Sequence, residues 1–150
     1  MAIYFGIVLL IVFVTRILAY WGAFFLKGNP VTIIPGVFSL TYVENYGAAF
    51  GIFQNAKLFL IVVALVLFLA VTYYVIATRK TAKRTFLISL AMIAGGGISN
   101  VADRLRFGFV VDYIDVQCIN YPVFNLADIC VVLGVIWLAV MIWKADSKKK

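Results

Sequence analysis

The chain has 150 residues, of which 65% are hydrophobic and only 13% are charged, and its formal net charge at pH 7 is +7. A soluble domain of this size is nearer half apolar and a quarter charged, so the composition excludes an ordinary water-soluble globule and favours lipid as the solvent. The absence of histidine excludes Ser-His-Asp and Cys-His catalysis, HExxH zinc chemistry and haem ligation by histidine.

The first predicted element is an apolar run over residues 2–25, which holds a single charge, Arg16. At 1.5 Å per residue, a run of this length reaches roughly 36 Å, enough to cross the hydrocarbon core of a bilayer. The run lacks a basic N-terminal region and is too long for the apolar part of a secretory signal. We therefore predict a transmembrane helix that is retained.

The connection after this run contains a predicted strand, Val37–Glu44. Apolar and polar side chains alternate along it, with Phe38, Leu40 and Tyr42 on one face and Ser39 and Thr41 on the other. This alternation is typical of a half-buried strand. Pro35-Gly36 precedes the strand and is typical of a turn.

Two uncharged apolar runs follow, over residues 58–77 and 85–102, and they predict two further transmembrane helices. The short connection between them, Thr78–Arg84, carries four cations, and the tail after residue 143 carries four more. With four spans, both termini and this connection lie on one side of the membrane. Clustered Lys and Arg predict that this side is cytoplasmic.

A second strand-like segment, Phe109–Asp115, precedes a fourth apolar run over residues 126–143, which contains Asp128. The predicted fold class is an all-α membrane protein, a four-transmembrane-helix bundle with a small extracytoplasmic β-sheet. We expect residues 1–150 to form a single integral membrane domain, because no repeat or low-complexity segment divides them.

The acidic residues are few, and they cluster near the predicted outer face. The six acids are Glu44, Asp103, Asp112, Asp115, Asp128 and Asp146. A carboxylate inside a span is costly and is a candidate functional group by default. Without histidine, paired carboxylates are the remaining acid–base machinery, because two that lie close together share one proton.

Each polar feature also has a purely structural interpretation. Asn125 and Asp128 have the spacing of a helix N-cap and its partner, and Asp103-Arg104 could be an ion pair at a helix end. The glycines Gly95–Gly97 could serve close helix packing. We interpret Cys118 and Cys130 as small buried hydrophobic residues rather than ligands. From the residues alone, these interpretations stay open.

Three motifs, in this order, together resemble the lipoprotein signal peptidase (signal peptidase II) family. They are LTYVENYGAAFGIF, which contains an N-x-G-A-A-F element, GGGISNVADRLRFGFVVDYID, and PVFNLADICVVLG. The resemblance covers nearly the whole chain. It implies an intramembrane aspartyl endopeptidase that removes signal peptides from diacylglyceryl-modified bacterial prolipoproteins, cutting before the lipidated cysteine.

The resemblance also implies the roles of particular residues, none of which spacing alone could assign. The catalytic pair would be Asp112 and Asp128. The supporting or substrate-binding residues would be Asn45, Asn100, Asp103, Arg104 and Asn125. The segment Asn45–Gly51 is a candidate clamp on the substrate.

The same resemblance implies partners and location. The partners are prolipoprotein substrates with a lipid-modified cysteine and membrane lipids, with no nucleic acid, metal or cofactor, and the protein is expected to be a monomer. It would be a multi-pass protein of the bacterial cytoplasmic (inner) membrane, with both termini cytoplasmic and the active site near the outer face.

One departure from the family pattern lies in the first run. Many members carry D-Q-x-x-K there, whereas this chain has Thr15, Arg16 and Ala19 at the corresponding acidic, amide and basic positions. Arg16 could instead pair with an outer aspartate. Alternative functions are a proton-coupled small membrane transporter or an inactive homologue, although transporters usually show internal repeats.

Overall fold

The computed structural model describes residues 1–48 and 51–147 of the chain. Ala49 and Phe50 of the N-x-G-A-A-F element, and the three terminal lysines, lie outside the described residues. The helices are α1 (Ala2–Trp21), continued by a π-helical turn (Gly22–Leu26), α2 (Lys57–Ala77), α3 (Arg84–Phe107) and α4 (Leu126–Ser147). The strands are β1 (Val31–Ile34), β2 (Phe38–Asn45) and β3 (Val110–Val116).

In the described part of the chain, four helices are long and apolar enough to cross a membrane, which confirms the predicted fold class. The third helix continues to Phe107, five residues beyond the predicted end of its apolar run. Gly108 ends it by adopting the left-handed conformation (φ 93°), which glycine reaches without steric cost, and its N–H bonds back to the carbonyl of Arg104. Three of these five extra residues are charged, and Asp103 and Arg104 are among them.

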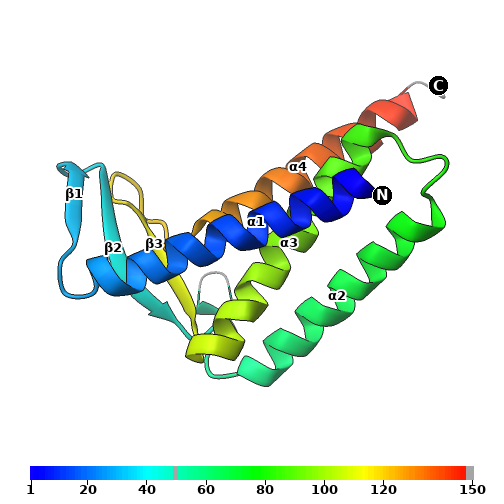
Figure 1. The fold of residues 1–150 in the computed structure, drawn as a ribbon. Coiled ribbons are helices and arrows are strands. Elements are labelled where there is room, and N and C mark those ends of the chain that lie inside the picture. Colours follow the sequence, from blue (N-terminus) through cyan, green and yellow to red (C-terminus); the bar gives the residue numbers. More distant parts are fainter. Residues whose placement is uncertain (49–50, 148–150) are drawn as a thin grey trace.

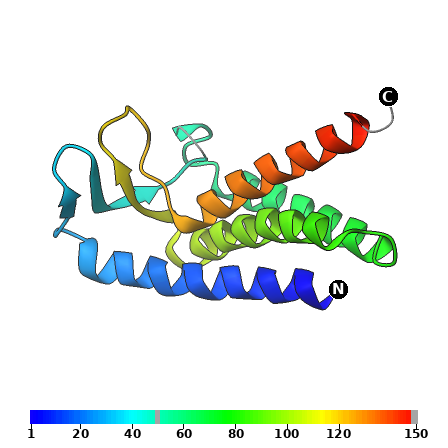
Figure 2. The ribbon, with the colours of Figure 1, turned by 90° about the horizontal axis from the view of Figure 1, so that it is seen from above.

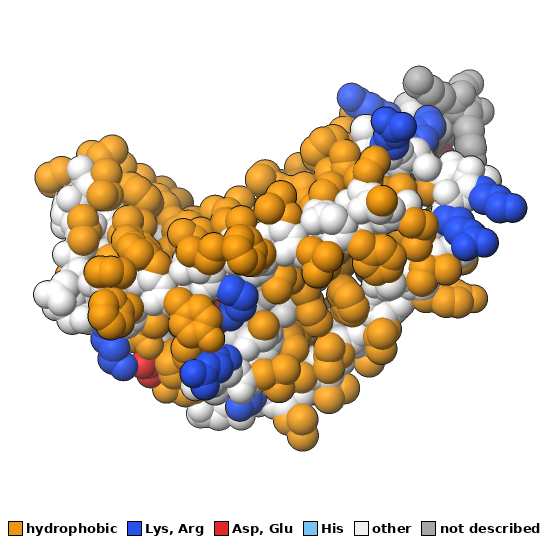
Figure 3. All heavy atoms as spheres, in the orientation of Figure 1, with side chains coloured by type: hydrophobic (Ala, Val, Ile, Leu, Met, Phe, Trp, Pro, Cys, Tyr) orange, Lys and Arg blue, Asp and Glu red, His pale blue; other side chains and the backbone are white. Residues whose placement is uncertain are grey.

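Helix α3 lies at the centre of the bundle, with α1 and α4 on either side of it and α2 packed along it (Figures 1 and 2). Both termini and the α2–α3 connection lie at one end, and the sheet lies at the other (Figure 1). Hydrophobic side chains cover much of the surface between these ends, and blue Lys and Arg side chains gather near the termini (Figure 3). An apolar surface of this extent is suited to lipid.

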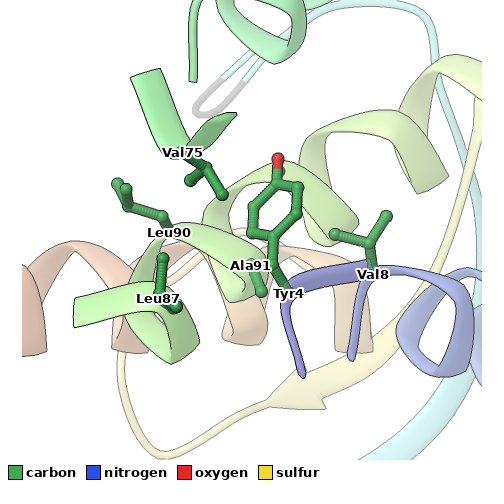
Figure 4. Packing of buried hydrophobic residues seen from close by; sticks show 7 residues of the cluster. Tyr4, Val8, Val75, Leu87, Leu90 and Ala91 are labelled. Carbon is green, nitrogen blue, oxygen red and sulfur yellow. The ribbon is translucent and has the colours of Figure 1, made fainter. Parts of the chain in front are cut away.

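The main apolar core lies where α1, α2 and α3 meet near the terminal end. Tyr4, Val75 and Ala91 are fully buried there and pack together (Figure 4). The Tyr4 hydroxyl forms a hydrogen bond of 2.9 Å with the hydroxyl of Thr72 on α2. This bond satisfies a polar atom that would otherwise lie unpaired among apolar side chains.

Glycine allows α3 to approach its neighbours closely. A Cβ atom built on Gly96 would lie 2.4 Å from the carbonyl oxygen of Ala127 on α4, and one built on Gly95 would lie 3.1 Å from Ile11 on α1. The interpretation of these two glycines as packing residues is therefore confirmed. The first turn of α4 lies against the middle of α3 because no side chain separates them.

The three strands form an antiparallel sheet in the order β1-β2-β3. The sequence predicted the second and third strands but not β1, whose four residues are all exposed. The buried face of the sheet packs on the end of α1 through Val111 and Tyr113, which contact Ala19 and Leu26. This contact holds the sheet against the end of the bundle.

A polar connection joins α1 to the half of α3 nearer the sheet. Arg16 forms an ion pair with Asp103, and it donates a second hydrogen bond of 3.0 Å to the carbonyl oxygen of Ser99. The Thr15 hydroxyl lies 2.9 Å from that of Ser99. Arg16 thus pairs with one of the clustered aspartates, Asp103, as the sequence suggested.

Two structural interpretations made from the sequence are wrong. Asp103 and Arg104 do not pair, because neighbouring residues of a helix point in different directions, and Asp103 faces α1 instead. Cys118 is not a buried hydrophobic residue but is exposed, because it lies in the turn after β3 rather than in a span. Cys130, on α4, is half-buried.

The contact between α3 and α4 predicts that Gly96→Ala destabilises the protein. Alanine favours a helix over glycine by about 1 kcal/mol, but a Cβ 2.4 Å from a backbone oxygen forces the helices apart, and such overpacking costs roughly 1–3 kcal/mol. We expect a lower Tm in detergent. The control is Gly6→Ala on α1, where nothing lies within 4 Å of the new Cβ. A Gly96→Ala Tm at or above that of the control would contradict this packing.

Candidate active site

A cavity of about 520 Å³ lies between the sheet, α2, α3 and α4. Its polar end contains five residues that the sequence singled out: Asn45, Asn100, Arg104, Asp112 and Asp128. Its apolar walls come from α2 and α4, and include Leu60, Val63, Ala64, Leu67, Val131 and Val132. The cavity therefore joins a cluster of acids and amides to a surface suited to hydrocarbon.

Two carboxylates from different elements meet at the polar end. Asp112 lies on β3 and is only 1% exposed, while Asp128 lies in the first turn of α4. The Asp128 carboxylate lies close enough to Asp112 to raise the pKa of Asp112 by electrostatic repulsion. Two acids that are 16 positions apart in the sequence thus form one interacting pair, in which Asp112 is buried and Asp128 is half-buried.

Every oxygen of the two carboxylates accepts a hydrogen bond. Amide groups of Asn125 and Asn45 donate to the two oxygens of Asp112, at 2.7 Å and 2.9 Å. The Asn100 amide donates to one oxygen of Asp128 at 2.8 Å, and the backbone N–H of Asn125 donates to the other at 3.2 Å. These donors come from β2, α3 and the start of α4, so several elements fix the two carboxyl groups.

Asn125 contacts both acids. Its side-chain oxygen accepts from the backbone N–H of Asp128 at 3.1 Å, and its own N–H donates to the Asp128 carboxylate. This reciprocal pair is a helix capping box, as the sequence suggested. The Asn125 amide nitrogen remains available to donate to Asp112. Asn125 therefore both caps α4 and connects the two acids.

The segment before α4 is held against the sheet, and this places Asn125 beside Asp112. Phe124 forms an isolated antiparallel bridge with Ile114 of β3, with hydrogen bonds of 2.8 Å and 3.1 Å. The Tyr113 hydroxyl accepts a hydrogen bond from the N–H of Leu126 at 3.2 Å. Tyr113 was not among the residues predicted from the sequence, although a buried tyrosine beside a candidate acid usually has a partner for its hydroxyl.

A β-bulge in β2 brings Asn45 to the same face of the sheet as Asp112. Leu40 pairs with Ile114, but Val43 pairs with Asp112, so β2 has one residue more than β3 between these pairs. Directly opposed side chains point to the same face, and one extra residue exchanges the faces beyond it. Without the bulge, Asn45 would point away from the acid to which it donates.

Arg104 and Asp103 lie around the pair without bonding to it. Arg104 donates to the carbonyl oxygen of Gly47 at 2.6 Å and to that of Asn100 at 3.3 Å. It thereby holds the segment after β2 over the cavity. Asp103 lies on the other side of α3, where it pairs with Arg16 and accepts from the N–H of Val111 at 3.4 Å. Asp103 thus supports the strand that carries Asp112 but does not line the cavity.

The environment of Asp112 favours its protonated form. Burial, and then repulsion from the Asp128 carboxylate, raise the pKa of Asp112 from 3.8 to about 7, although the hydrogen bonds from Asn45 and Asn125 oppose this change. Asp115 lies elsewhere, on the sheet, where it accepts from Ser39 and Gln117. Asp112 can therefore hold a proton near neutral pH, as a general acid requires.

The apolar wall from α2 was not predicted. Leu60, Ala64 and Leu67 have the spacing of one helix face, but they lie in a run that is apolar on every side, so its pattern indicates no particular face. Within residues 1–48 and 51–147, no three acidic, cysteine or histidine side chains converge in a way that could hold a metal ion. Two carboxyl groups that lie this close together are suited to acid–base chemistry, because they can share one proton.

Comparison with known proteins identifies relatives over most of the chain. The family described as "Signal peptidase (SPase) II" matches residues 4–144. A lipoprotein signal peptidase from Clostridium novyi (strain NT) is 41% identical over 144 residues, 93% of each chain. Another from Streptococcus thermophilus (strain CNRZ 1066) is 39% identical over 118 residues, 78% of this chain and 76% of the relative.

Solved structures show the same fold. A bacterial membrane enzyme determined by the in meso method at 2.3 Å resolution is similar, with a TM-score of 0.89 and 28% identity, over 98% of this chain and 91% of the other. A second bacterial membrane enzyme, at 1.9 Å resolution, has a TM-score of 0.80 and 27% identity, over 93% and 91% of the two chains. The helical bundle with its small sheet is thus shared with membrane enzymes.

The raised pKa of Asp112 predicts that stability falls as pH rises. Between pH 4 and pH 7 the folded protein holds a proton on Asp112 that the unfolded chain has released, so the free energy of unfolding decreases across this window. The upper bound is roughly 4 kcal/mol. We expect Asp112→Asn to show a smaller difference in Tm between pH 5 and pH 8 than wild type. Asp115→Asn, which removes a carboxyl outside the cavity, should keep the wild-type difference, and equal pH dependence in all three proteins would refute the argument.

Proposed function

Because this chain belongs to the signal peptidase II family and is thus a peptidase of prolipoproteins, we propose that it cleaves them as an intramembrane aspartyl endopeptidase. The proposed catalytic residues are Asp112 and Asp128. The proposed cut lies just before the lipid-modified cysteine of a diacylglyceryl-modified precursor. The observation that carries the catalytic type is the pair of carboxyl groups bridged by Asn125, one of them buried and the other half-buried.

The proposed reaction uses one proton shared by the pair. Two neighbouring carboxyl groups cannot both ionise in a buried site, so Asp112 holds the proton and Asp128 is the base. Asp128 removes a proton from a water molecule, and the oxygen of this water attacks the scissile carbonyl carbon. Asp112 gives its proton to the carbonyl oxygen, which forms a gem-diol.

Collapse of the gem-diol completes the reaction. Asp112 takes back a proton from one hydroxyl as the C–N bond breaks, and the proton on Asp128 goes to the leaving amine nitrogen. Both acids then return to their starting protonation states. The asparagine donors hold the carboxyl groups in place throughout, so the geometry needs no rearrangement during the reaction.

The apolar walls support a lipid-modified substrate that enters from the side. Leu67 on α2 and Val131 on α4 line the cavity, and both helices expose many large apolar side chains on their outer surfaces. The substrate's apolar signal helix would lie along these helices, and the acyl chains of its cysteine would extend between α2 and α4 toward lipid. A single copy of the chain contains both carboxyl groups, which supports a monomer as the active form.

Arg16 supports activity despite the departure from the D-Q-x-x-K pattern. Its guanidinium compensates the charge of the buried Asp103, which in turn accepts the N–H of Val111, next to Asp112. The family's lysine position, Ala19, is buried against the sheet instead. The positive charge that Asp103 requires is thus supplied within α1 from a different position.

The proposed catalytic roles predict that Asp112→Asn and Asp128→Asn each abolish cleavage. Asparagine keeps the size of the side chain but cannot hold or transfer the carboxyl proton, and loss of acid–base catalysis costs about 10²–10⁴-fold in rate. The measurement is a gel shift of a diacylglyceryl-modified precursor incubated with purified protein. Asp115→Asn is the matched control, because that carboxyl bonds to Ser39 and Gln117 and not to the pair.

The control should retain most of the wild-type rate. Near wild-type cleavage by either Asp112→Asn or Asp128→Asn, with the protein folded, would show that this residue is not catalytic. If the wild-type protein cleaved no lipidated precursor, the proposed reaction as a whole would be refuted.

The proposed topology places the inner membrane around the bundle, with the sheet outside and the termini in the cytoplasm. Cys118 is exposed at the sheet end and Thr81 is exposed at the terminal end. A membrane-impermeant maleimide should therefore label wild-type protein on intact cells through Cys118. Cys118→Ser should prevent this labelling.

A second variant tests the opposite side. Thr81→Cys in the Cys118→Ser background should be labelled only after the membrane is permeabilised. If Thr81→Cys were labelled on intact cells while Cys118 of the wild type was protected, the orientation would be the opposite of the one proposed.

A further inference from the structure

Three consecutive glycines of α3 have different surroundings. Gly95 and Gly96 have neighbours that a Cβ atom would meet at 3.1 Å or less, so packing against α1 and α4 accounts for them. Gly97 has nothing within 4 Å of the position of a Cβ, and it lines the cavity three residues before Asn100. Packing within the protein therefore does not account for Gly97.

Glycine in the middle of a helix is unfavourable, because the unfolded chain has more conformational freedom than with alanine. At Gly97 the fold gains no close helix contact in return. The space left by the missing side chain belongs to the cavity that contains Asp112 and Asp128. This space is adjacent to the turn of α3 whose Asn100 donates to Asp128.

We infer that Gly97 sets the size of the substrate side chain that precedes the scissile bond. The inference rests on the proposed function. In an extended peptide, successive side chains point to opposite sides. If the lipidated cysteine after the cut faces the lipid side, between α2 and α4, the preceding side chain faces α3, which packs against both of these helices. Gly97 is the part of α3 that lacks a side chain there.

The test compares Gly97→Ala, Gly97→Val and Gly97→Leu on three lipidated precursors that carry glycine, alanine or leucine before the cut. A side chain on α3 that fills this space should discriminate by size, and one methylene group in a pocket changes specificity by about 10–200-fold. We expect Gly97→Leu to cut the leucine precursor at least about 100-fold more slowly than wild type. It should cut the glycine precursor within about 10-fold of wild type.

Stability separates this role from damage to the fold. A new Cβ at position 97 meets no atom, so Gly97→Ala should raise the Tm if the fold is undamaged. Gly6→Ala is the matched control, since Gly6 is also in a helix with nothing within 4 Å and lies on α1, outside the cavity lining. It should cleave all three precursors as wild type does.

Two outcomes would overturn the inference. In the first, Gly97→Leu or Gly97→Val lowers the cleavage rate of all three precursors by the same factor. In the second, these variants cleave all three precursors at the wild-type rate. If Gly97→Leu does not fold, the ratio of rates on the glycine and leucine precursors in Gly97→Val decides. Failure of the wild-type protein to cleave any precursor would instead refute the proposed function.

Discussion

Asn125 is the residue on which the arrangement of the polar end depends, because it bonds to both carboxyl groups at once. Its side chain donates to Asp112, and its backbone N–H donates to Asp128. The same residue caps α4, so the hydrogen bonds that begin the helix also orient the pair. Burying two acids costs free energy unless their oxygens have partners. Here the cap and three asparagine side chains supply those partners.

Helix α3 connects this polar end to the apolar bundle. Its first half is apolar and packs with α1 and α2, while its last turns carry Asn100, Asp103 and Arg104. These three side chains point in different directions, toward Asp128, toward α1 and toward the segment after β2. A helix with polar residues all around one end cannot face lipid there. The sheet and the end of α1 therefore have to cover it.

The cavity combines two kinds of surface because its walls come from two kinds of element. The sheet, the end of α3 and the first turn of α4 supply amides and acids, whereas α2 and the next turn of α4 supply side chains that match a hydrocarbon chain. A peptide that carries acyl groups needs both surfaces at one point, since water must reach its peptide bond while its lipid remains out of water. This combination restricts the site to the end of the bundle, where the two surfaces meet.

Much of the architecture followed from the sequence alone, because hydrophobic runs long enough to cross a bilayer have few alternative structures. The four helices, β2, β3 and the capping box at Asn125 were predictable from local patterns, and the resemblance to a family supplied the candidate residues. Other features depend on contacts between distant segments. The bulge in β2 that turns Asn45 toward Asp112 is a matter of register between two strands, which neither strand specifies by itself. The surroundings of the glycines in α3 also depend on where α4 lies. Gly96 packs against Ala127, whereas Gly97 lines the cavity. Three consecutive glycines are identical in the sequence, so the sequence does not show this difference.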